Sequence, residues 1–195
     1  MCRRQVKNMP NIAIYAGHGG SDSGVTDNVS RLKEKNFTLV LANAVTVILR
    51  NFGYSVVNNH TTDTARNITR DAKLANDKNA DAVVEIHLNG NSGKPQSGSE
   101  AYVSIRDAAL WGGKAKTLAQ AILNHLSEID FHNRGVFTSV TASGIDTLGI
   151  LRLTNMPTVL LEVAFINNPQ DMSHLDIETV SAAIAGGIKQ VFPVG

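Results

Sequence analysis

Cysteine is almost absent from this chain. Cys2 is the single cysteine among 195 residues, and it lies in a polar N-terminal stretch. A disulfide within the chain and a zinc site built from cysteines are therefore both excluded. Any metal ion that the protein holds must be bound by histidine, aspartate or glutamate side chains.

Long apolar runs and an excess of charge of one sign are also missing. The 18 basic and 17 acidic residues leave a formal net charge of +1, which gives no electrostatic argument for a nucleic-acid partner. No apolar stretch approaches the roughly 20 residues that cross a bilayer, so we expect no membrane insertion. A hydrophobic content of 43% over 195 residues is typical of one globular domain with a substantial core.

Several sequence signatures do not occur. Residues 1–10 lack the apolar segment of a secretory signal peptide, and we expect them to form a flexible tail before a single domain over residues 11–195. The absence of Gly-x-Ser-x-Gly disfavours a serine hydrolase. The glycines around His18 match neither the dinucleotide-binding nor the P-loop spacing.

The spacing of apolar residues alternates between strand-like and helix-like segments. It predicts strands over residues 12–15, 54–57, 83–88, 100–105, 148–153 and 158–163. It predicts helices over residues 34–50, 64–78 (capped by Asp63), 108–127 and 178–192, with an irregular stretch over 130–147. This alternation implies an α/β fold in which helices cover both faces of a mainly parallel sheet.

Three of the predicted strands end on side chains that can bind metal or transfer protons. Gly17-His18-Gly19 follows the first strand, His87 ends the run 82–87, and Glu162 ends the run 157–162. In open α/β sheets, ligands bind in the crevice beyond the carboxyl ends of the strands. The sequence therefore predicts one site at this edge of the sheet.

Two histidines and one carboxylate are the candidate metal ligands. His18 and His87 lie at equivalent strand ends, and Glu34 opens the first helix. Two histidines with one carboxylate match the zinc sites of hydrolases, which keep a fourth position for water. Each residue also has an ordinary structural interpretation, since a glutamate in the first turn stabilises a helix by itself.

Glu162 is the candidate catalytic carboxylate. It follows the apolar residues 159–161, where an unpaired carboxylate is costly to bury. Beside an activated water it could accept a proton and return it to a leaving nitrogen. The structural alternative is an ion pair with Arg152 on a neighbouring strand.

Four segments carry a family resemblance. They are Ala16-Gly17-His18-Gly19-Gly20, Lys33-Glu34-Lys35-Asn36, Glu85-Ile86-His87-Leu88-Asn89 and the stretch 160–169. In order and spacing they resemble the zinc-dependent N-acetylmuramoyl-L-alanine amidases of the amidase-3 type, found in bacterial cell-wall hydrolases and phage endolysins. The resemblance covers residues 12–192, nearly the whole chain.

The resemblance implies a twisted six-stranded sheet and one zinc ion per chain, held by His18, Glu34 and His87. Glu162 would be the catalytic residue, and residues 11–195 the catalytic domain. The implied reaction is hydrolysis of the amide between N-acetylmuramic acid and L-alanine of the stem peptide, with peptidoglycan as the partner. Because residues 1–10 lack the features of a signal peptide, we expect a protein made in the cytoplasm, and this suits release to the wall through a phage holin or cell lysis.

The chain departs from the family pattern near the expected ligands. Glu85 stands two residues before His87, where the family usually has serine, and residues 60–63 replace a Thr-Arg element. Because a strand neighbour often helps to orient a ligand, we expect Glu85 to support the site. Asn89 is predicted to contact substrate or to have a structural role in the loop.

Two other functions stay open. One is another zinc-dependent cell-wall peptidase or deacetylase, and the other is a wall-binding homologue without catalysis. The sequence makes no prediction of the oligomeric state.

Overall fold

A computed structural model describes residues 9–90 and 96–195 of the chain. The predicted flexible tail therefore lies outside the described residues, apart from Met9 and Pro10. Pro10 is buried, and its carbonyl oxygen accepts a hydrogen bond from the Ser55 amide at 3.0 Å. Within the described ranges, no helix has both the length and the apolar character needed to cross a membrane.

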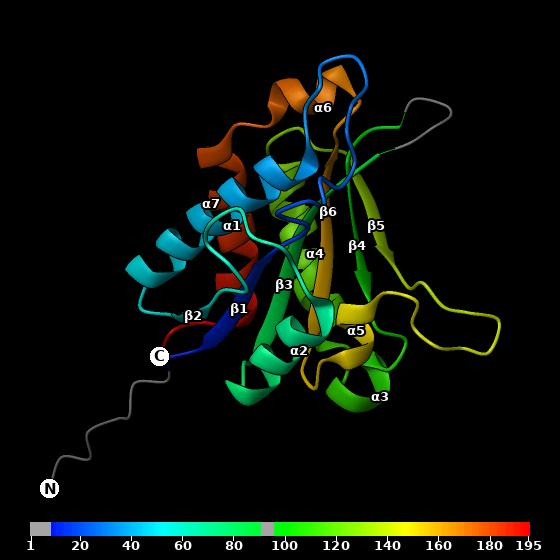
Figure 1. The fold of residues 1–195 in the computed structure, drawn as a ribbon. Coiled ribbons are helices and arrows are strands. Elements are labelled where there is room, and N and C mark those ends of the chain that lie inside the picture. The colour runs from blue at the N-terminus through cyan, green and yellow to red at the C-terminus, as the bar shows by residue number, and fades with distance from the viewer. Residues whose placement is uncertain (1–8, 91–95) are drawn as a thin grey trace, which may run out of the picture.

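Six strands form one sheet in the order β2-β1-β3-β6-β4-β5 (Figure 1). All neighbouring strands run parallel except β4 and β6, which run antiparallel. The prediction of a mainly parallel, six-stranded α/β sheet is confirmed. The strands are β1 (Asn11–Ala16), β2 (Ser55–Val57), β3 (Ala82–Asn89), β4 (Ser99–Val103), β5 (Asn133–Phe137) and β6 (Thr158–Phe165).

Helices cover both faces of the sheet, as predicted. Buried residues of α1, α4 and α7 form one core with the sheet, and those of α2 and α5 form a second core on the opposite face (Figure 1). The helices are α1 (Glu34–Asn51), α2 (Ile68–Asp77), α3 (Asp107–Trp111), α4 (Lys114–Ser127), α5 (Gly149–Leu153), α6 (Pro169–His174) and α7 (Ile177–Val191).

Two predicted segments are wrong in type. The strand expected over residues 148–153 is the short helix α5, in which the adjacent residues Ile150 and Leu151 are both buried. A short apolar run does not distinguish a strand from a buried helical turn. The sixth strand comes instead from β5, inside the stretch 130–147 that was expected to be irregular. Because β5 is an edge strand with little burial, its sequence lacks a clear alternation.

Two predicted helices have different bounds. α2 begins at Ile68, since the side chain of Asn67 accepts a hydrogen bond from Arg70 N and caps the helix in place of Asp63. The long helix expected over residues 108–127 is divided into α3 and α4. Gly112 and Gly113 separate them with φ values of 62° and 78°, in the left-handed region that favours glycine.

The register of the parallel strands brings the polar side chains to one edge. His87 of β3 pairs with Glu162 of β6, and Glu85 pairs with Leu160 two positions earlier. Leu160 belongs to the core beneath α2 and α5. Because side chains alternate along a strand, Glu85, His87 and Glu162 all face that side of the sheet.

Candidate metal centre

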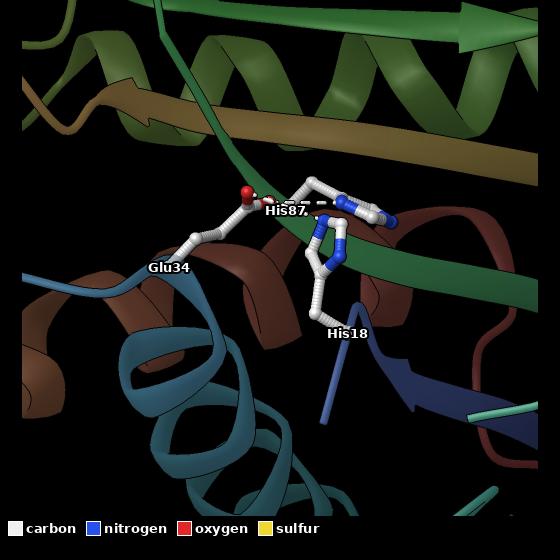
Figure 2. A group of neighbouring side chains, drawn as sticks. All are labelled: His18, Glu34 and His87. Carbon is white, nitrogen blue, oxygen red and sulfur yellow. Dashed lines mark hydrogen bonds and ion pairs between the residues drawn. The ribbon is translucent and has the colours of Figure 1, made fainter. Parts of the chain in front are cut away.

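Three side chains from separate segments converge beyond the ends of β1 and β3. His18 follows β1, Glu34 is the first residue of α1, and His87 lies near the end of β3. Figure 2 shows them pointing toward one another, and one potential ligand atom from each lies within 4.8 Å of the others. These are the three residues that the sequence predicted as metal ligands.

Glu34 lies between the two histidines. Its Oε1 is 2.9 Å from His87 Nδ1, and its Oε2 is 3.2 Å from His18 Nε2 (Figure 2). The same carboxylate accepts hydrogen bonds from the backbone amides of Leu88 at 3.0 Å and Val25 at 2.8 Å. The backbone amides fix the carboxylate in place, so that it faces both imidazoles.

Glycines make room for this arrangement. His18 has a φ of 63°, and the glycines that follow it allow the chain to turn sharply away from β1. A Cβ atom on Gly17 would overlap the His87 ring. A Cβ atom on Gly24 would lie 2.5 Å from Glu34 Oε2 and 2.6 Å from His18 Cδ2. The loop can therefore approach the three side chains only because it lacks side chains at these two positions.

Each histidine has a carboxylate on the nitrogen that faces away from Glu34. His18 Nδ1 is 2.8 Å from Asp22 Oδ2, and His87 Nε2 is 3.6 Å from Glu85 Oε2. A carboxylate on the outer nitrogen favours the tautomer whose inner nitrogen has a free lone pair. Both inner nitrogens, His18 Nε2 and His87 Nδ1, face the Glu34 carboxylate.

The electrostatics of the cluster favour a positive charge. Burial by itself would lower the pKa of His87, but contacts with Glu34 and Glu85 outweigh it and raise this pKa to about 10. The pKa of His18 is also raised, because Glu34 and Asp22 outweigh burial. Burial by itself would raise the pKa of Glu34, but the two histidines outweigh burial and hold this pKa well below its usual range. The pocket therefore stabilises a cation where the three side chains meet.

Glu162 lies beside this cluster on β6. It lines the same cavity of about 480 Å³ as the three candidate ligands. Burial, reinforced by the charges of Glu34 and Glu100, raises the pKa of Glu162 to about 7 despite the opposing charge of His87. Its Oε2 is buried and has no hydrogen-bond partner among the described residues.

The structural alternative for Glu162, an ion pair with Arg152, is not what the structure has. Arg152 lies on α5, and its Nη1 donates a hydrogen bond to the carbonyl oxygen of Asp146 at 2.7 Å. Arg152 is thus used to tie α5 to the preceding loop. Glu162 remains a carboxylate that faces the cavity.

Asn89 lies at the rim of the cavity with both ends of its side chain occupied. Its Nδ2 donates to Glu100 Oε1 at 2.8 Å, and its Oδ1 accepts from the Gly90 amide at 2.8 Å. These contacts fit the structural alternative for this residue. A second cavity of about 400 Å³ shares Asn89 and Gly90 with the first, so a substrate contact by Asn89 stays a prediction.

The sequence reasoning missed two residues around the centre. Asp22 lies in a glycine-rich loop four residues after His18, where an aspartate is ordinary. Arg66, which precedes α2, forms an ion pair with Glu85. Glu85 was the available signal, because a carboxylate within a buried strand requires a nearby cation.

Comparison with known proteins identifies the family. The sequence family described as N-acetylmuramoyl-L-alanine amidase (amidase-3) matches residues 12–191 of this chain. The chain belongs to the amidase-3 family. The resemblance inferred from the four segments is thereby confirmed.

Individual members of the family are similar over most of the chain. A sporulation-specific N-acetylmuramoyl-L-alanine amidase of Bacillus subtilis (strain 168) is 31% identical over 94% of this chain and 69% of that protein. The structure of Cwp6 from Clostridium difficile has a TM-score of 0.87 and 35% identity, covering 94% of this chain and 29% of that chain. The structure of an N-acetylmuramoyl-L-alanine amidase from Clostridium difficile 630 has a TM-score of 0.83 and 27% identity, and the match covers 94% of this chain and 96% of that chain. This chain therefore spans less than a third of the Cwp6 chain.

Proposed function

We propose that this chain is a peptidoglycan hydrolase that cleaves the amide between N-acetylmuramic acid and L-alanine of the stem peptide. Family membership over residues 12–191 supports the reaction. The observation that carries the proposal is the convergence of His18, Glu34 and His87 in the cavity that Glu162 also lines. A hydrolase of this kind needs a metal site and a proton carrier side by side, and both sets of groups are present.

We assign a zinc ion to His18, Glu34 and His87. Two imidazole nitrogens and one carboxylate oxygen are a donor set that zinc prefers in hydrolases. The raised pKa of His87 and the cradle left by Gly17 and Gly24 fit a small cation at this point. When bound, zinc supplies Lewis acidity, which polarises an amide carbonyl and makes water acidic enough to attack near neutral pH.

We assign proton transfer to Glu162. A general base works best when its pKa lies near the operating pH, and burial raises the pKa of Glu162 to about 7. Glu162 lines the cavity, and its Oε2 has no hydrogen-bond partner among the described residues that would commit the carboxylate to another protein group. Glu162 would accept the proton of the attacking water and return it to the nitrogen that leaves with L-alanine.

The same proposal gives the bounds of the catalytic domain and the site in the cell where it acts. Residues 11–195 would be the catalytic domain, and its partner would be peptidoglycan in the cell wall. The chain spans 69% of the Bacillus subtilis relative and 29% of the Cwp6 chain, so these statements concern this domain. Release to the wall by a phage holin or by cell lysis stays a prediction.

Product analysis on purified peptidoglycan tests the function. We expect new amino groups on L-alanine, intact glycan strands and one zinc ion per chain by elemental analysis. A peptidase would instead free amino groups of other stem residues, and a deacetylase would release acetate. A wall-binding homologue would release nothing, and each of these three results would contradict the proposed amidase.

A further inference from the structure

A buried row of charged side chains continues from His87 away from the cavity. Glu85, with 1% of its side chain exposed, lies two residues before His87 on β3. Arg66 Nη2 donates a hydrogen bond to Glu85 Oε1, and Arg66 Nε lies 3.4 Å from Oδ2 of the fully buried Asp71. Because Arg66 is itself only 10% exposed, this row is removed from solvent along most of its length.

Such a row is expensive for a fold to keep. Burying an ion pair costs desolvation that the attraction between its members often fails to recover. An apolar residue at position 85 would continue the pattern of β3, whose neighbouring positions are Val84 and Ile86. The retention of a charged pair here is explained if one of its atoms has a further partner.

Two buried atoms without hydrogen bonds indicate that this further partner of Glu85 is His87. Glu85 Oε2 and His87 Nε2 are both buried, and neither has a hydrogen-bond partner among the described residues. They lie 3.6 Å apart, slightly beyond hydrogen-bond distance. Arg66 holds the other oxygen of the same carboxylate, so Oε2 is the oxygen left to face the imidazole.

The orientation of His87 gives this contact a direction. Its Nδ1 faces Glu34 at 2.9 Å, so Nε2 is the nitrogen turned away from the candidate metal position. For Nδ1 to offer its lone pair to a metal, Nε2 must carry the hydrogen and needs an acceptor. Glu85 Oε2, 3.6 Å away, is the acceptor atom that faces this nitrogen.

We propose that Arg66 and Glu85 form a positioning pair, which holds the His87 imidazole in the tautomer and orientation that bind zinc through Nδ1. Arg66 neutralises the buried carboxylate and fixes its Oε1, and this directs Oε2 at His87 Nε2. The inference rests on the proposed function, because it takes His87 as a zinc ligand. It adds Arg66, a residue of the segment before α2 that is not part of the cavity lining, to the determinants of metal affinity.

The two histidines differ in the strength of this support. The outer nitrogen of His18, Nδ1, contacts the carboxylate of Asp22. The Asp22 side chain is 61% exposed, and Asp22 lies only four residues from His18 along the chain. An exposed pair of this kind contributes little, whereas a contact between buried charged groups is screened less by solvent and contributes more. We therefore expect zinc affinity to depend more on Glu85 than on Asp22.

A double variant separates positioning from a purely structural ion pair. Replacing both partners with Arg66→Met and Glu85→Met removes both charges of the pair, and the buried Asp71 keeps Arg70 at 3.3 Å, so the fold should retain most of its stability. Zinc affinity, measured by competition with a chromogenic chelator, is expected to fall about 10- to 100-fold. The visible absorption spectrum of the Co²⁺-substituted protein should also change, because one ligand is no longer held.

Two single substitutions complete the test. Glu85→Gln keeps the side-chain volume and is the reference if the double variant does not fold, and we expect the same loss of zinc affinity and the same change in the Co²⁺ spectrum. Asp77→Asn, in the exposed Lys73–Asp77 pair of α2, is the control and should leave both unchanged.

The outcomes distinguish this inference from the function on which it rests. If the unmodified chain binds no zinc, the proposed metal centre itself is wrong. If the unmodified chain binds zinc and releases L-alanine amino groups, while folded variants at positions 66 and 85 keep its affinity and Co²⁺ spectrum, the positioning pair alone is overturned.

Discussion

At the scale of single residues, we expect the catalytic rate to depend on Glu162. Glu162→Gln removes the basic oxygen while it preserves the shape of the side chain, so proton transfer should fail and zinc should stay bound. We expect the rate of L-alanine release to fall at least about 100-fold, the low end for loss of a general base. Rate assays and zinc analysis of the same preparation measure both effects.

The control for this substitution is Glu128→Gln, whose carboxylate is 69% exposed beside His125. It should retain the rate of the unmodified chain. Undiminished hydrolysis by Glu162→Gln would show that another group carries the proton.

Gly24 tests the close approach of the loop to the metal centre. Gly24 has a φ of 63°, and a Cβ atom there would lie 2.5 Å from Glu34 Oε2. Gly112 has nearly the same φ of 62°, but a Cβ atom on it would meet nothing within 4 Å. Gly112→Ala should therefore cost only the left-handed strain, about 1–2 kcal/mol in the free energy of unfolding, and keep zinc.

Gly24→Ala should cost more than Gly112→Ala and should weaken zinc binding as well, because the added methyl group displaces Glu34 or His18. Denaturant titrations and chelator competition measure these two quantities. Equal effects of the two substitutions on zinc affinity would show that the lack of a side chain at Gly24 is not needed for the metal centre.

At the scale of secondary-structure elements, the packing of α4 against α7 depends on Gly187. A Cβ atom on Gly187 would lie 2.6 Å from the backbone of Ile122, whereas one on Gly186 would lie 3.3 Å from the side chain of His125. The His125 side chain is 33% exposed and can turn away. Gly187→Ala should therefore lower the free energy of unfolding by about 1–3 kcal/mol through overpacking.

Gly186→Ala should be close to neutral, since the gain in helix propensity, about 1 kcal/mol, offsets the adjustment of His125. Thermal and denaturant unfolding check both variants. Zinc content should be unchanged in both, and a loss of zinc in Gly187→Ala would show that this helix contact influences the distant site.

The elements also show where reading the sequence succeeds and fails. α1 was predicted nearly to its bounds because Leu41, Val45 and their neighbours repeat with the helical period over 18 residues. The segment of α5 was predicted as a strand, because a short apolar run does not distinguish a strand from a helical turn. β5 was missed, because an edge strand with little burial lacks a clear apolar alternation. The division between α3 and α4 depends on two adjacent glycines, whose left-handed conformation the apolar pattern of the helix does not reveal.

The whole molecule is expected to bind zinc in competition with protons. The pKa of His18 is raised, and contacts with Glu34 and Glu85 outweigh burial and raise that of His87 to about 10, so the His87 ring is positively charged in the metal-free site near neutral pH. It must lose a proton before it binds zinc, and zinc affinity should therefore rise with pH. Calorimetric titrations in two buffers of different ionisation enthalpy measure the protons released, and an absence of release would contradict the raised pKa values.

The stability of the metal-free protein should have the opposite dependence on pH. A raised histidine pKa contributes stability that is fully present below about pH 6.5 and is lost as the pH rises through the folded-state value, about 10 for His87. The increase in melting temperature caused by zinc should therefore be larger at about pH 8 than at about pH 6. Scanning calorimetry with and without zinc tests this difference.

The candidate site as a whole was more predictable than its surroundings. His18, His87 and Glu162 follow apolar strands, and parallel strands bring such ends together, so their convergence follows from the pattern of the chain. Asp22 and Arg66 lie in loops without periodicity, where the backbone path decides which polar group meets which. The ion pair of Glu85 could be anticipated from its burial, but its partner could not.

His18, Glu34 and His87 belong to three different segments, and Glu34 and His87 are 53 residues apart in the chain. An unfolded chain cannot gather them, so bound zinc would act as a reversible cross-link that joins the start of α1 to the ends of two strands. At a free zinc concentration about 1,000 times the dissociation constant, this cross-link would add about 4 kcal/mol to the free energy of unfolding. An environment that removes zinc would thus leave a protein that is both inactive and easier for proteases to degrade.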